Sequence, residues 1–155
     1  MILVYSKNCQ KIIDELRALN LEYKCISDLD FQKKMKDLLM QPVIEGTCTK
    51  EDFLYLDGLN EEQMKSLDEN VHVLRVAVST PTKLEWNLEQ LMEEIEKEYI
   101  YFKVRNDLYQ ILIHPNKERL NMDSNYLKQL AYAFSLYENE KTPVEILQQV
   151  LDALR

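Results

Sequence analysis

Glycine, histidine and cysteine are scarce in this sequence, and each shortage excludes a class of site. Two glycines among 155 residues leave no glycine-rich loop of the kind that cradles phosphate groups. Two histidines and three cysteines, with no C-x-x-C spacing, are too few and too scattered for the usual zinc sites. We therefore expect no metal and no cofactor, and the sequence contains no recognisable catalytic constellation.

Basic charge is also in short supply. Acidic residues outnumber basic ones by 27 to 19, which gives a net charge of -8 and an isoelectric point near 4.9. Proteins that bind a nucleic-acid backbone or an anionic membrane need a basic surface, and the densest basic run here, residues 33–36, is short. We expect neither nucleic acid nor membrane as a partner.

The sequence also lacks the segments that direct a chain to or through a membrane. Residues 1–5 run directly into a strand pattern, so no signal peptide is expected. No apolar run approaches the length of a membrane-spanning helix. The cysteine count is odd, and together these features favour a reducing, cytoplasmic setting.

What the chain has in quantity is apolar residues, at 46%, which is enough for a substantial core. Four apolar segments predict strands, at residues 2–5, 21–27, 53–56 and 72–79. Helical patterns follow them, and the scarce prolines and glycines leave residues 41–50 as the most loop-like interval. We expect an α/β sheet domain over residues 1–99 and a helical C-terminal extension over 100–155, packed on it.

The most informative stretch is residues 76–88, which predicts a buried strand, a proline-stiffened loop and a capped helix. Asn87 and Gln90 have the spacing of a capping box, and Trp86 with Leu91 that of a hydrophobic staple. The helical periodicity continues from Leu88 to about residue 114, so we expect one long helix. The β-rich composition of residues 99–113 leaves a hairpin as the alternative.

A weak internal repeat suggests how the strands pair. Asn8 and Asn60 stand at predicted helix starts, and Ser27 and Ser79 close the next strands, each pair 52 residues apart. Two βαβ units of this kind favour a four-stranded, ferredoxin-like α+β sheet with its helices on one side. A doubly wound parallel sheet is the alternative.

Part of the chain resembles a small bacterial domain family of unknown function. The resemblance covers about residues 45–99 and rests on three segments: Phe53–Leu59, Ala77–Thr82 and Trp86–Leu88. The chain departs from the family pattern at Leu84-Glu85, where polar or basic residues are expected, and at Asn87, where threonine is common. The resemblance implies a fold and no mechanism.

Two weak candidate sites follow from the pattern. Cys9 stands where a strand leads into a helix, faintly like the start of thioredoxin-like redox proteins, and a thiol at a helix N-terminus near Lys7 favours the thiolate. Packing of Cys9 in the apolar face of its helix is the alternative. The loop after the fourth strand has ligand-type side chains in a position where α/β sheets often bind ligands, namely Ser79, Thr80, Thr82, Lys83 and Trp86.

The functional expectation is a non-enzymatic binding or protein-interaction module. Without a catalytic constellation, the most prominent functional feature is the excess of amphipathic helix in the C-terminal part. Six of the nine tyrosines, a residue type common at interfaces, lie at or after residue 99. We expect a protein partner or self-association through these helices. The alternative is a small-molecule or thiol-dependent enzyme that uses Cys9 or the Ser79–Lys83 loop.

Overall fold

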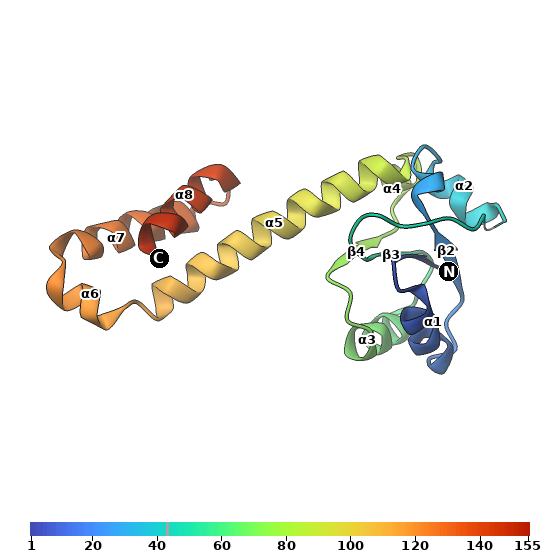
Figure 1. Ribbon diagram of the computed structural model, residues 1–155, viewed down its shortest axis with the longest axis horizontal. Helices are drawn as coiled ribbons and strands as arrows, with labels where there is room; N and C mark the ends of the chain where they lie inside the picture. The colour runs from blue at the N-terminus through green and yellow to red at the C-terminus, as the bar shows by residue number, and fades with distance from the viewer. Residues whose placement is uncertain (43) are drawn as a thin grey trace. The chain divides into compact units, whose positions relative to one another are not determined.

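A computed structural model describes residues 1–42 and 44–155 (Figure 1). Val43, inside the predicted loop 41–50, lies outside the described residues. The chain forms two compact units, Met1–Glu96 and Lys97–Arg155, whose boundary falls close to the predicted one at residue 99. The predicted packing of the second unit on the first stays a prediction.

The first unit is a mixed four-stranded sheet with helices. Its elements are β1 (Ile2–Tyr5), α1 (Cys9–Ala18), β2 (Tyr23–Ile26), the 3-10 turn η1 (Asp28–Asp30), α2 (Met35–Met40), β3 (Phe53–Leu56), α3 (Glu61–Asn70), β4 (Arg75–Val78), α4 (Pro81–Leu84) and the start of α5 (Leu88–Ile113). The strand order is β2-β1-β3-β4. β1 is parallel to β2 and β3 to β4, whereas β1 and β3 are antiparallel, with Ile2 opposite Leu56.

The mixed α+β class is as predicted, but the ferredoxin-like arrangement is not. In that fold a strand of the other unit separates the parallel strands of each unit, and here β1 and β2 are direct neighbours. The doubly wound alternative is also wrong, because β1 and β3 run antiparallel. Every residue of β1 and β3 is buried, so the two most apolar strands pair at the centre of the sheet.

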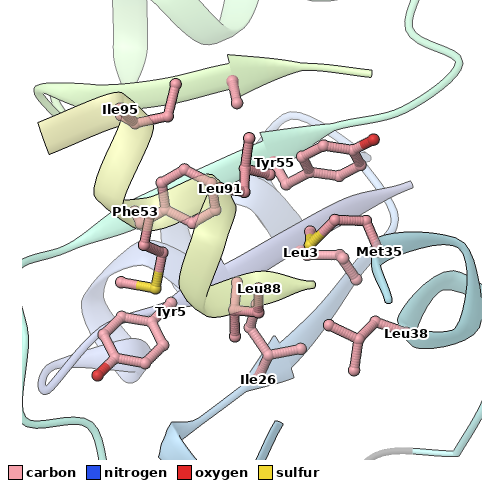
Figure 2. Packing of buried hydrophobic residues seen from close by; sticks show 12 residues of the cluster. Leu3, Tyr5, Ile26, Met35, Leu38, Phe53, Tyr55, Leu88, Leu91 and Ile95 are labelled. Carbon is pink, nitrogen blue, oxygen red and sulfur yellow. The ribbon is translucent and has the colours of Figure 1, made fainter. Parts of the chain in front are cut away.

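Helices cover both faces of the sheet, where the prediction placed them on one. α1 and α3 cover one face and contribute Ile12, Leu16 and Leu67 to a core with Ile2, Val4, Leu54 and Leu56. α2 and the first turns of α5 cover the other face through Met35, Leu38, Leu88, Leu91 and Ile95 (Figure 2). Alternate residues of each central strand therefore enter different cores, which explains their unbroken apolar sequence.

The predicted burial of the fourth strand holds for only one of its faces. Ala77 is buried, whereas Val76 and Val78 are 39% and 47% exposed. β4 lies at the edge of the sheet, so a strand that is apolar on both faces is covered on only one.

The elements of the first unit recur at the spacing that the sequence repeat suggests. α1 and α3 have the same length and are 52 residues apart. β2 and β4 keep this spacing, and the offset becomes 53 only after them, because Ser27 and Thr80, rather than Ser79, are the equivalent N-caps. Two backbone hydrogen bonds join equivalent residues of the two halves. Met35 N donates to Trp86 O (2.9 Å), and Leu88 N donates to Lys33 O (3.0 Å). Lys33 and Trp86, like Met35 and Leu88, are 53 residues apart.

The predicted capping box of Asn87 and Gln90 is present, and the predicted helix start at Asn60 has a second one. Gln63 N donates to Asn60 Oδ1 at 2.8 Å while Asn60 N donates to Gln63 Oε1 at 3.0 Å. Gln90 N donates to Asn87 Oδ1 at 2.8 Å, and Asn87 N to Gln90 Oε1 at 3.2 Å. These local signals fix where α3 and α5 begin.

The second unit is helical. It comprises the remainder of α5 with α6 (Lys117–Met122), α7 (Ser124–Glu138) and α8 (Val144–Leu154). The long helix replaces the alternative hairpin, as the periodicity predicts. Its buried core is Val104, Leu108, Tyr126, Leu130, Ala133, Leu147, Leu151 and Leu154. Among the described residues, no helix has the length and apolarity to cross a membrane.

Candidate functional site

The three cysteines, far apart in sequence, meet at one end of the parallel pair β1 and β2. Cys9 is the first residue of α1, Cys25 lies on β2, and Cys48 follows α2 in the segment that leads to β3. All three line an open cavity of about 280 Å³, together with Ser6, Ile26, Ser27, Ile44, Glu45 and Gly46. Cavities just beyond the carboxyl ends of parallel strands are where α/β sheets commonly bind ligands.

The Ser6 hydroxyl shapes the turn that presents Cys9. Ser6 is buried, and its Oγ donates to Asp52 Oδ1 (2.7 Å) and accepts from Asn8 N (2.9 Å). Asn8, which stands at the predicted helix start, makes no side-chain hydrogen bond to the helix. The chain therefore turns directly from the end of β1 into α1, with Cys9 facing the cavity.

The thiols are free, half-buried and engaged in weak hydrogen bonds. Cys9 Sγ donates to Ser6 O (3.1 Å), and Cys48 Sγ donates to Ile26 O (3.4 Å). Burial, reinforced by the neighbouring Cys9 and Cys48, raises the pKa of Cys25 to about 12. Burial likewise raises the pKa of Cys48. Cys25 and Cys48 are therefore thiols, not thiolates, at neutral pH.

The cluster is not a preformed metal site. Within residues 1–42 and 44–155, no three histidine, cysteine or acidic side chains are arranged to hold a metal ion. The chemistry that the cavity offers is that of thiols.

A glycine closes one wall of the cavity. A Cβ atom on Gly46 would lie 2.3 Å from Ser27 Oγ and 3.0 Å from Leu29 Cδ1. Only glycine allows the backbone of the 44–48 segment to approach Ser27, the N-cap of η1, this closely. One of the two glycines of the chain thus sets the position of Cys48.

A network of hydrogen bonds holds the chain just after Cys48, at Thr49 and Lys50. Tyr5 donates a hydrogen bond to Asp28 Oδ1, and its Oη accepts from Thr49 N and Lys50 N, both at 3.1 Å. Thr49 Oγ1 also donates to Asp28 Oδ2 at 2.7 Å. Burial alone would raise the pKa of the Asp28 carboxyl, but the hydrogen bonds from Tyr5 and Thr49 outweigh it and hold the pKa below its usual value.

This network predicts an acid-sensitive contribution to stability. Because the pKa of Asp28 is lower in the folded chain, its contribution is present above the unfolded pKa near 3.8 and is lost as the pH falls below it. We expect Asp28→Asn to lower the free energy of unfolding at pH 7 and to flatten its decline between about pH 4 and pH 2. Denaturant titrations of the wild type and the variant across that pH range measure the two free energies of unfolding. If both declined in parallel as the pH falls, the prediction would be contradicted.

The other predicted site, the Ser79–Lys83 loop, is occupied by contacts of the fold itself. Tyr55 donates to Ser79 Oγ (2.8 Å), and Lys83 Nζ donates to Val78 O (3.2 Å). Thr80 caps α4 by accepting from Lys83 N (3.1 Å), so the predicted loop contains a short helix with Pro81 at its start. These bonds account for the polar groups structurally, and a ligand role for the loop stays a prediction.

Glu85 and Trp86, at the end of this loop, contact the segment that begins α2. Trp86 is half-buried against the core under α5, and its carbonyl accepts the hydrogen bond from Met35. Glu85 accepts from Lys34 (3.2 Å) and Lys36 (2.9 Å), so the densest basic run meets an acidic partner. The contacts of Trp86 are therefore those of a packing residue, and its ligand role stays a prediction too.

In the helical unit, α7 has two apolar faces. The helical spacing of its sequence puts Leu127, Leu130, Ala131, Phe134 and Tyr137 on one side, but among these only Leu130 is buried, together with Tyr126 and Ala133. Leu127 and Phe134 are instead 62% and 51% exposed, and Ala131 between them is exposed as well. We call Leu127, Ala131 and Phe134 the outer face of α7.

A groove lies on another side of α7. It has a volume of about 200 Å³ and is lined by Gln129, Tyr132, Ile146, Gln149, Val150, Ala153 and Leu154 from α7 and α8.

Charge is balanced in this unit, because residues 97–155 contain eight basic and eight acidic side chains. The whole net charge of -8 therefore belongs to the first unit.

Sequence reasoning identified Cys9 but not the cluster around it. The available signal was that Cys25 lies near the end of a predicted strand, in the same βαβ unit as Cys9, and nothing local placed Cys48. Comparisons with protein-family models, curated proteins and solved structures found no match, so the resemblance to a bacterial domain family receives no support from them.

Proposed function

We propose that this protein is a non-enzymatic interaction module whose C-terminal helical unit binds a second copy of the same chain. The observation that carries the proposal is the outer face of α7. A helix with apolar residues on two faces belongs in a buried environment, and α7 buries Tyr126, Leu130 and Ala133 but leaves Leu127 and Phe134 exposed.

The neighbouring surface supports the same partner. Tyr132 and Ile146, on the groove between α7 and α8, are 58% and 38% exposed. Exposed apolar side chains of this kind are found at protein interaction sites, and tyrosine is enriched in them.

The charge of the unit favours a second copy. A surface with strong net charge repels its own copies, whereas residues 97–155 carry eight charges of each sign. Two helical units can therefore approach each other without net repulsion. Two copies of the first unit would repel each other, because that unit carries the whole net charge of -8.

The test is the assembly state of the full chain. We expect sedimentation velocity at rising concentration to show a dimer, and the double variant Leu127→Glu/Phe134→Glu to raise its dissociation constant at least about tenfold, because two buried charges oppose association. Leu74→Glu is the matched control, since Leu74 is 74% exposed in the first unit and its replacement is expected to leave the dimer intact.

Three results would contradict this proposal. A wild-type chain that stays monomeric at all concentrations excludes a second copy as the partner. A double variant that dimerises like the wild type excludes the outer face. A monomer whose free energy of unfolding falls sharply in the double variant would mean that another part of the same chain covers this face.

A further inference from the structure

We infer that Cys9 and Cys25 form a reversible dithiol–disulfide site inside the cavity at the carboxyl ends of β1 and β2. The inference is independent of the proposed self-association. It rests on three thiols lining one open cavity, where a small oxidant or a thiol reductant has access.

The face of the sheet selects the pair. In the register of the parallel strands, Cys25 is opposite Val4, which belongs to the core under α1. Cys9 packs against that same core, whereas Cys48 packs against the core of the opposite face. Cys9 and Cys25 therefore share one side of the sheet, and both line the same cavity.

The fold does not require these thiols. With the 52-residue offset of the matching elements, Cys9 corresponds to Glu61, the first residue of α3, and Cys25 to Ala77, the third residue of β4. The second half builds the same helix start and the same strand without sulfur. The paired thiols are thus a feature of the first half alone.

The chemistry requires an oxidant, for which a hydroperoxide is sufficient. The Cys9 thiolate attacks the peroxide, so a sulfur–oxygen bond forms, the oxygen–oxygen bond breaks, and the departing oxygen takes a proton. Cys25 then attacks Cys9 Sγ; the sulfur–sulfur bond forms, and the oxygen leaves as water with the proton of Cys25. Two thiols lose two electrons and two protons, and the peroxide gains them.

The order of the two steps follows from the state of Cys25. A thiol that is protonated at neutral pH is a poor first attacker of peroxide. Once Cys9 is oxidised, the presence of Cys25 in the same cavity makes the second step intramolecular. An external dithiol reverses the reaction by thiol–disulfide exchange.

The test uses the reduced full chain and hydrogen peroxide. We expect the intact mass to fall by the two hydrogens lost, a peptide map to link Cys9 to Cys25, and dithiothreitol to restore the thiols. Cys48→Ala is expected to form the same bond. Cys25→Ala, which installs the residue of the second half, is expected to stop at a Cys9 sulfenic acid that dimedone traps.

The chain unfolded in guanidinium is the control for selectivity. There the three pairings compete without a fixed geometry, so we expect a mixture and a formation rate at least about tenfold lower than in the folded chain. A native bond to Cys48, no intramolecular bond, or the same mixture in the folded and unfolded chains would overturn the inference.

Discussion

Replacing Leu91 by alanine is expected to lower the free energy of unfolding of the first unit by about 2–5 kcal/mol. Leu91 is fully buried, and α5 places it over the central strands beside Leu3 and Phe53 (Figure 2). The truncation removes apolar contacts and leaves a cavity that a packed sheet cannot close. Because a domain of this size is stable by only about 5–15 kcal/mol, the loss is large.

Leu108→Ala is the matched variant, because the same helix contributes this fully buried leucine to the core of the second unit. The single tryptophan, Trp86, packs against the first core and reports its unfolding by fluorescence. We expect Leu91→Ala to shift the tryptophan transition strongly and Leu108→Ala to shift mainly the helical signal in circular dichroism. Equal shifts of the tryptophan transition would mean that the two units unfold together.

Replacing Gly46 by alanine is expected to lower the free energy of unfolding by about 1–3 kcal/mol, as overpacking typically does. The new Cβ would lie 2.3 Å from Ser27 Oγ, the hydroxyl that caps η1. Either the cap or the 44–48 segment must move, and movement of the segment exposes Cys48. Denaturant titration measures the first effect, and the alkylation rate of Cys48, expected to rise, measures the second.

Two variants separate this clash from other effects of losing a glycine. Gly58 has a φ of +70° and no atom within 4 Å of a new Cβ, so Gly58→Ala costs only the backbone strain of about 1 kcal/mol and leaves Cys48 unchanged. Ser27→Gly removes the clashing side chain, so Gly46→Ala should cost less in that background. If Gly46→Ala lowered the free energy of unfolding equally in the Ser27→Gly background, a clash with the Ser27 side chain would not be the cause.

Local signals in the sequence determined where most elements begin and how long they are. Asn60 and Asn87 cap α3 and α5 as predicted, because a capping box involves residues only three positions apart. The bounds of β1 and β3 follow from unbroken apolar runs, and α5 continues to Ile113 because its periodicity does. The short α4 was the exception, since its Thr80-Pro81 start was interpreted as a stiff loop.

Strand order and exposure were decided only by the tertiary structure. The pairing of β1 with β3 is a contact across some fifty residues, and it left β4 at an edge with Val76 and Val78 exposed. No local pattern distinguishes that strand from a central one. The same holds for α7, whose two apolar faces look alike in sequence although only one of them is in the core.

The cavity with the three cysteines was also decided only by the tertiary structure. The sequence supplied three cysteines at positions 9, 25 and 48 and indicated a special position for Cys9 alone. Their meeting depends on the parallel pairing of β1 with β2 and on the close approach that Gly46 permits. Secondary structure follows from interactions between residues a few positions apart, whereas the thiol cavity requires three distant segments to be held together by the sheet.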